Sequence, residues 1–169
     1  MVESMYALVI YDSTFGNTQQ IAQIIARVLG EHVPVQISPV EEVSTSELKK
    51  ADVLVLGCPT QNYDLTPDVR AFLETLPERI VGDLMAAAFD TRYRTSAWST
   101  GSAAWSIARQ LQEAGVSLIL PPESFFVAAK EGPLEDGELE RAAQWAKTLF
   151  ERFDSWYQHR RECAKSQLS

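Results

Sequence analysis

Cysteine and histidine are scarce in this sequence, which holds two of each among 169 residues. Cys58 and Cys163 lie far apart and in unlike surroundings, so nothing supports a disulfide framework or a cysteine zinc site. His32 and His159 lie far from the polar loops described below and form with them neither a catalytic triad nor a metal-ligand set. A chain with so few cysteines fits a reducing compartment, and we expect it in the cytoplasm.

Basic residues and long apolar runs are also scarce. Fifteen lysines and arginines stand against 23 aspartates and glutamates, which gives a net charge of −8 at pH 7. A nucleic-acid-binding surface needs the opposite balance, so we expect no nucleic acid as partner. No apolar run is long enough to cross a membrane, and the first residues, which include Glu3, do not resemble a secretory signal. We therefore expect no membrane partner either.

Hydrophobic residues make up 46% of the chain, enough for one globular domain with a sizeable core. Apolar runs typical of strands alternate with amphipathic patterns typical of helices. The run 53–56 is apolar on both faces, as expected of a central strand in a parallel sheet covered by helices on both sides. Strands are expected at 5–11, 33–37, 52–58, 85–89 and 117–120, with 125–128 resuming after Pro121 and Pro122, and helices at 18–29, 44–50, 67–76, 104–111 and 139–153.

This alternation predicts an α/β protein with a doubly wound parallel sheet. We expect one domain over residues 1–150, with residues 151–169 forming the end of the last helix and a C-terminal tail. In such sheets, ligands bind beyond the carboxyl ends of the strands, at the topological switch point. Three loops, 11–18, 58–66 and 89–101, are expected to meet there.

The first of these loops leaves a strand and opens a helix, which is the arrangement of an anion site. Ser13, Thr14, Asn17 and Thr18 add side-chain donors, and the loop contains no lysine or arginine. A P-loop would need lysine where Asn17 stands, and a dinucleotide fingerprint would need three glycines where only Gly16 is present. A single phosphate monoester, held by hydroxyls and amides, fits this loop best.

The sequence Ser13-Thr14-Phe15-Gly16-Asn17-Thr18, directly after an apolar strand, resembles the FMN-phosphate loop of flavodoxins. The resemblance covers nearly the whole chain in element order. It implies a three-layer, doubly wound, five-stranded parallel sheet in the order 2-1-3-4-5, with FMN at the switch point. It also implies that residues 13–18 hold the FMN phosphate.

The loop that follows the third expected strand resembles the flavodoxin loop that lies along the isoalloxazine ring. By that resemblance, Thr60 and the backbone of Gln61 and Asn62 face the central edge of the ring, with Pro59 beside them. Many flavodoxins have glycine in this turn, and Asn62 is expected to take its place because asparagine tolerates the left-handed region. Tyr63 either stacks on the ring or is an ordinary half-exposed loop tyrosine.

The third loop resembles the flavodoxin loop that contacts the pyrimidine edge of the ring. The resemblance implies that Asp90, Thr91 and the backbone of Arg92 reach this edge. Tyr93 and Trp98 are both candidates for stacking on the ring, and the sequence does not choose between them.

We therefore expect an FMN-binding electron-transfer protein that works with a redox partner protein. The alternative is an NAD(P)H-dependent quinone or FMN reductase on the same scaffold, with Arg92, Arg94 and Trp98 around a substrate cavity. The two arginines are otherwise solvated loop charges. Asp12, Asp64 and Asp90 are expected to disfavour a second negative charge on the flavin, and Cys58 is expected to be a buried apolar residue and not a nucleophile.

Overall fold

The computed structural model describes residues 5–80, 82–95 and 101–168. The strands are β1 (Ala7–Tyr11), β2 (Val35–Pro39), β3 (Val53–Pro59), β4 (Met85–Tyr93), β5 (Ser117–Leu118) and β6 (Glu123–Val127). The helices are α1 (Asn17–Gly30), the short 3-10 helix η1 (Val40–Glu42), α2 (Thr45–Lys50), α3 (Pro67–Arg79), α5 (Ala103–Glu113) and α6 (Glu138–Gln167).

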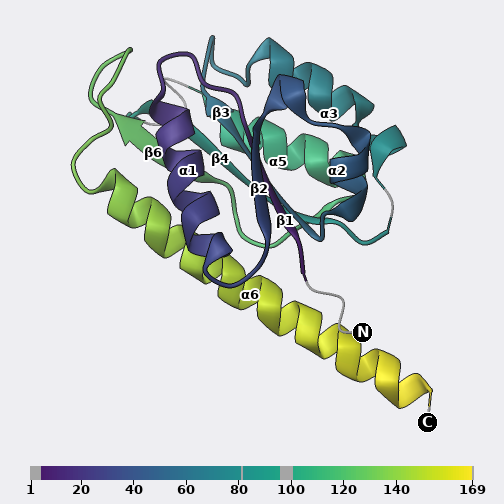
Figure 1. Cartoon of the computed structure of the whole chain (residues 1–169). Coiled ribbons are helices and arrows are strands. Elements are labelled where there is room, and N and C mark those ends of the chain that lie inside the picture. Colours follow the sequence, from purple (N-terminus) through teal and green to yellow (C-terminus); the bar gives the residue numbers. More distant parts are fainter. Residues whose placement is uncertain (1–4, 81, 96–100, 169) are drawn as a thin grey trace.

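The strands form one parallel sheet in the order β2-β1-β3-β4-β5, which confirms the predicted doubly wound α/β fold. Helices cover both faces, with α1 and α6 on one side and α3 and α5 on the other (Figure 1). Alternate side chains of β3 supply both cores: Leu54 and Leu56 pack on the α3 and α5 side, whereas Val53 and Val55 pack on the α1 and α6 side.

The fifth position of the sheet is divided between two short strands that pair with β4 in succession. β5 pairs with the start of β4 and β6 with its end, so that Met85 faces Ser117 and Phe89 faces Glu123. Pro121 and Pro122 lie between them and lack the N–H groups that a continuous ladder needs. The predicted resumption of the strand after the two prolines is confirmed.

β4 is longer than the sequence pattern predicted, because it continues from Phe89 to Tyr93. Residues 90–93 were expected in a loop, but here they pair with β6, and Thr91 also pairs with Pro59 of β3. Asp90 and Thr91 therefore have strand partners on both sides, whereas Arg92 and Tyr93 pair with β6. The consequence for the site is that the direction of each side chain in 90–93 follows strand alternation.

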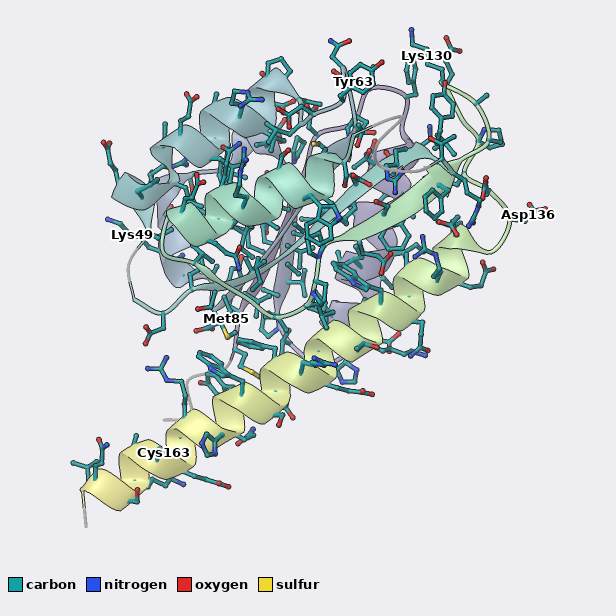
Figure 2. All side chains as sticks on the ribbon, turned by 180° about the vertical axis from the view of Figure 1, so that it is seen from behind. Lys49, Tyr63, Met85, Lys130, Asp136 and Cys163 are labelled. Atoms are coloured by element: carbon teal, nitrogen blue, oxygen red, sulfur yellow. The ribbon has the colours of Figure 1, made fainter. Side chains whose placement is uncertain are left out.

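The last helix is also longer than predicted, since α6 runs without a break to Gln167 and includes most of the expected tail. Its buried apolar side chains are Ala142, Trp145, Ala146, Leu149 and Phe153, spaced as one helical stripe. Beyond this stripe the helix projects past the body of the molecule, where Cys163 is exposed (Figures 1 and 2). In the described ranges, no helix is both long and apolar enough to cross a membrane.

Glu138, at the start of α6, ties this helix to β6 and makes folding depend on pH. The side chain is 3% exposed, and Oε2 accepts hydrogen bonds from the Phe126 N–H at 2.7 Å and from Arg141 Nη2 at 2.6 Å. Burial acts to raise the pKa of Glu138, but the hydrogen bonds from Arg141 and Phe126 outweigh it and lower the pKa below 4.5. The charged form is therefore favoured in the folded state.

We expect this contribution to stability to be complete above the unfolded pKa and lost as pH falls through the lower, folded pKa. Urea unfolding of the protein and of Glu138→Gln, followed from about pH 7 to about pH 3, checks it. The stability difference between the two should shrink in acid. A difference that stays constant over this range would contradict the assignment.

Candidate functional site

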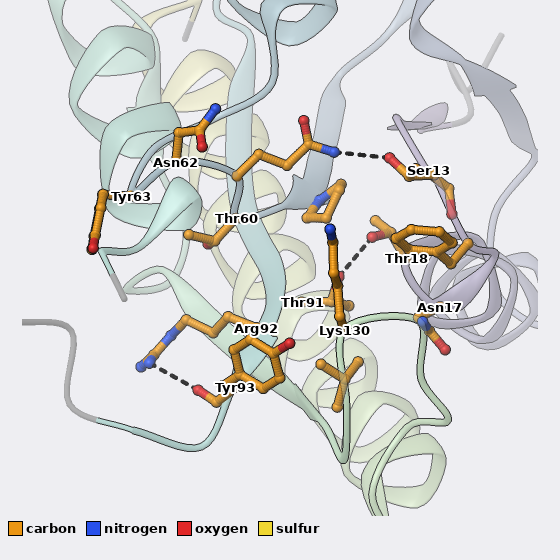
Figure 3. Close-up of a pocket in the computed structure, with 15 residues that line it drawn as sticks. Ser13, Asn17, Thr18, Thr60, Asn62, Tyr63, Thr91, Arg92, Tyr93 and Lys130 are labelled. Carbon is orange, nitrogen blue, oxygen red and sulfur yellow. Dashed lines mark hydrogen bonds between the residues drawn. The ribbon is translucent and has the colours of Figure 1, made fainter. Parts of the chain in front are cut away.

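A cavity of about 650 Å³ opens at the carboxyl ends of β1, β3 and β4, within the size range of small-molecule sites (Figure 3). The three predicted loops do meet here. The predicted residues that line it are Ser13, Thr14, Phe15, Asn17, Thr18, Pro59, Thr60, Gln61, Asn62, Tyr63, Thr91, Arg92 and Tyr93. Gly16 belongs to the first loop without lining the cavity, and Trp98 lies outside the described residues.

The β1–α1 loop is held in shape by its own side chains. Ser13 Oγ accepts hydrogen bonds from the N–H groups of Gly16 at 3.1 Å and Gln19 at 3.3 Å. Gly16 has φ of 90°, a conformation that favours glycine, and α1 begins at the next residue. The first N–H groups of a helix have no partner inside it, and the first turn of α1 carries no acidic residue. This end of the cavity therefore suits an anion.

Two buried polar side chains connect the start of α1 to other parts of the cavity wall. Thr18, 1% exposed, shares a hydrogen bond of 2.7 Å between its Oγ1 and that of Thr91 on β4. Asn17 donates from Nδ2 to the carbonyl oxygen of Glu131 at 3.2 Å, which holds the β6–α6 loop against α1. Both contacts place hydroxyl and amide groups at the anion-binding end.

The β3–α3 loop contains a tight turn with two unusual residues. Gln61 and Asp64 exchange backbone hydrogen bonds of 2.8 and 2.9 Å, and the central residues Asn62 and Tyr63 have φ of 47° and 67°. Positive φ at both central positions is typical of a type I′ turn. Asn62 adopts the predicted left-handed conformation, whereas that of Tyr63 was not predicted, because a bulky residue rarely adopts it. The Tyr63 backbone packs against Gly101, where a Cβ would not fit.

Asp90 does not line the cavity, in contrast to its expected role at the ring. Its side chain is fully buried, and Oδ2 accepts hydrogen bonds from Ser102 Oγ at 2.7 Å, the Ala104 N–H at 3.0 Å and Thr60 Oγ1 at 3.1 Å. The reason is the extension of β4: alternation turns Thr91 to the cavity and Asp90 to the start of α5. Asp90 therefore supports the wall from behind.

Thr60 is the link between this buried carboxylate and the cavity. Its hydroxyl donates to Asp90 and accepts from the Ala103 N–H at 2.9 Å. Both hydrogen bonds stay within the protein, so the proton of this hydroxyl is not offered to a ligand. Thr14 and Gln61 bridge the two loops above it, with Gln61 Nε2 donating to Thr14 Oγ1 at 2.9 Å.

Arg92, near the end of β4, and Arg94, just after it, are both held by contacts within the protein. Arg92 donates from Nη1 to the Thr95 carbonyl at 2.6 Å and from Nε to Ser124 Oγ at 3.0 Å. Arg94 forms an ion pair with Glu135, with Nε 2.7 Å from Oε2. Both guanidinium groups also lie over the ring of Phe126. These contacts assign them a structural role that the sequence left open.

Among the described residues, the remaining polar groups near the cavity give no sign of a nucleophile or a metal centre. Burial raises the pKa of the Cys58 thiol to about 12, which keeps it neutral and agrees with its expected packing role. Burial also acts to raise the pKa of Asp64, but hydrogen bonds from Ser106, Leu65 and Arg70 lower it, and Arg70 Nη2 lies 2.6 Å from its carboxylate. Across the part of the chain that the structure describes, no cluster of metal ligands occurs.

Two lining residues, Val127 and Lys130, were not predicted. They come from the end of β6 and the β6–α6 loop, far along the chain from the other lining residues. The signal was present, because 125–128 was expected as a strand whose carboxyl end lies at the same edge of the sheet as those of β1 and β3. The loop after it therefore lies at the same edge of the sheet as the other three.

The sequence model of the flavodoxin family matches residues 9–145. A solved flavodoxin from the domain Archaea is 25% identical with a TM-score of 0.75, over 89% of this chain and 99% of that one. Oxidised flavodoxin 1 from Bacillus cereus is 22% identical with a TM-score of 0.69, over 86% of this chain and 97% of that one.

A larger protein also contains this fold. Rubredoxin oxygen:oxidoreductase from Desulfovibrio gigas is 19% identical with a TM-score of 0.73, over 89% of this chain but 36% of that one. No significant match is found among curated protein sequences. The family match covers most of the chain, and the sheet of this protein has the strand order of flavodoxins. The chain therefore belongs to the flavodoxin family, whose cofactor is FMN.

Proposed function

We propose that this chain binds FMN in the cavity and transfers electrons to or from a redox partner protein. The observation that carries the proposal is the meeting, in one cavity, of the anion-binding start of α1 and the turn at Asn62 and Tyr63. When bound, FMN supplies the group that takes up and releases electrons. The protein contributes binding, orientation and electrostatics.

The residues of the cavity fit such a cofactor. The hydroxyl, amide and N–H groups of the β1–α1 loop would hold the phosphate, with Thr18 and Thr91 beside it. The turn of the β3–α3 loop and Tyr93 would flank the ring, and Trp98 stays a second stacking candidate. Tyr63 is 71% exposed and Tyr93 is 41% exposed, so both stand at the rim, where a partner would approach.

The acidic groups around the cavity differ in what they would do to a flavin. Asp64 is paired with Arg70, which offsets its charge, and Asp90 is enclosed by three hydrogen-bond donors. These two carboxylates should therefore oppose a negative charge on the flavin less strongly than their number alone suggests. The reductase alternative places Arg92 and Arg94 around a substrate cavity, but both already have partners within the protein.

The absorption spectrum of the protein tests the proposal. We expect purified protein to be yellow, to release FMN on denaturation and to take FMN up again. Anaerobic NADPH should leave the flavin unchanged unless a partner reductase is added. A colourless protein that does not bind FMN would refute the proposal, and bleaching by NADPH alone would establish the reductase instead. The cytoplasmic location stays a prediction.

Removal of the Thr18 hydroxyl is expected to weaken FMN binding by about 1–3 kcal/mol, the usual cost of losing a donor to a charged group. Thr18→Val keeps the shape of the side chain, and Thr18→Ser serves as the control because it keeps the hydroxyl. Titration of the apoprotein with FMN, read by quenching of flavin fluorescence, measures the change. Equal affinity of the two variants would mean that the phosphate lies elsewhere.

A further inference from the structure

The loop at the anion-binding end of the cavity has no positively charged side chain to balance the charge of a phosphate. A phosphate monoester carries a charge of about −1.5 to −2 at neutral pH. The β1–α1 loop, residues 11–18, contains no lysine or arginine, and the chain as a whole has a net charge of −8. Hydroxyls and the helix dipole offset part of the phosphate charge, but a nearby cation would offset more.

The β6–α6 loop brings a cation to this place. The Glu131 carbonyl accepts the hydrogen bond from Asn17, the first residue of α1. Gly132, at φ of 106°, packs so closely on the Asn17 side chain that a Cβ would collide with it. These two contacts fix the loop against the start of α1. Lys130, the residue before Glu131, lines the same cavity as Ser13. Figure 3 shows its side chain extended into the cavity.

The Lys130 ammonium is available to a ligand. Among the described residues it forms no hydrogen bond and no ion pair, whereas the nearby arginines at 92 and 94 bind the β4–α5 loop and Glu135. Lys130 itself is exposed, so pairing with an anion would not require it to leave an internal partner.

We propose that Lys130 pairs with the phosphate of FMN and makes this site select phosphorylated over unphosphorylated flavin. The inference rests on the proposed function. An ammonium pairs with phosphate as a point charge, so its contribution should weaken as salt screens it. Riboflavin, which has the same ring and no phosphate, should not depend on Lys130.

The test measures the dissociation constants of FMN and riboflavin with the full-length apoprotein and its variants. We expect Lys130→Gln to weaken FMN binding about tenfold and to reduce its salt dependence, with riboflavin binding unchanged. Lys130→Arg should retain most of the affinity. Lys49→Gln is the matched control, because it removes one positive charge from exposed α2, far from the cavity (Figure 2), and should leave FMN binding unchanged.

The other outcomes separate this inference from the proposed function. Unchanged FMN affinity in Lys130→Gln would overturn the inference, and so would an equal loss for FMN and riboflavin, which would place Lys130 at the ring. If Lys49→Gln weakened FMN binding as much as Lys130→Gln, the effect would come from net charge alone. That result would also overturn the inference. If the unaltered protein bound neither flavin, the proposed function would fail, independently of Lys130.

Discussion

Replacing Phe89 with alanine is expected to lower the free energy of unfolding by about 3–5 kcal/mol, the usual cost of truncating a fully buried aromatic residue. Phe89 lies in β4 and is completely buried. Its ring makes edge contacts with Phe125 at 6.1 Å and Trp145 at 6.3 Å between centroids. The same ring fills the space over Gly57, where no Cβ would fit. Truncation would therefore open a cavity among β3, β4, β6 and α6.

Urea unfolding measures this loss, and two variants control it. Phe89→Leu keeps most of the buried volume and should lose clearly less stability. Trp105→Ala removes an aromatic side chain that is 63% exposed on α5, so its stability should change by no more than about 0.5 kcal/mol. If Phe89→Ala were as stable as the Trp105 variant, the three-ring cluster would not be the core that we describe.

Replacing Asp90 with alanine is expected to cost about 3 kcal/mol of stability and to weaken FMN binding, since each buried donor left without a partner costs about 1–3 kcal/mol. Asp90 receives hydrogen bonds from Ser102 and Ala104, both at the start of α5, and from Thr60 in the β3–α3 loop. Its position at the start of α5 also favours a negative charge there. Its removal should thus loosen the β3–α3 loop and the start of α5 together.

Two measurements test the effect of replacing Asp90, one for stability and one for FMN affinity. Urea unfolding gives the stability, and flavin titration of the apoprotein gives the affinity. Asp90→Asn keeps one acceptor oxygen and should lie between the alanine variant and the unaltered protein in both. A loss of stability with no change in FMN affinity would show that Asp90 anchors α5 without shaping the cavity.

The order of the sheet could be predicted because its central strands are continuous apolar runs between strongly periodic helices. The apolar run 53–56 indicates a buried strand, and the periodic stripe that begins at Ile21 indicates an amphipathic helix. The ends of elements were predicted less well. Residues 90–93 are polar and give no strand signal, because their strand state depends on pairing with β6, a segment far along the chain. Such pairing is a tertiary effect that local pattern does not carry.

The site was predicted to a similar extent. Thirteen predicted residues line the cavity, since their loops follow strands whose carboxyl ends share one edge of the sheet. The direction of individual side chains was harder to predict. Asp90 turns inward because β4 continues past Phe89, and Lys130 was overlooked because its loop has no distinctive composition. The positive φ of Tyr63 is set by the turn, and a bulky residue such as tyrosine rarely adopts it, so the sequence did not indicate it.

The prolines at the two edges of the sheet have a consequence for how the protein behaves at high concentration. An exposed strand edge can pair with another chain and seed aggregation. Here, one edge strand, β2, ends at Pro39, and the opposite edge is broken between β5 and β6 by Pro121 and Pro122. Proline offers no N–H to an incoming strand. Both edges are therefore poor templates, which should oppose aggregation through strand pairing.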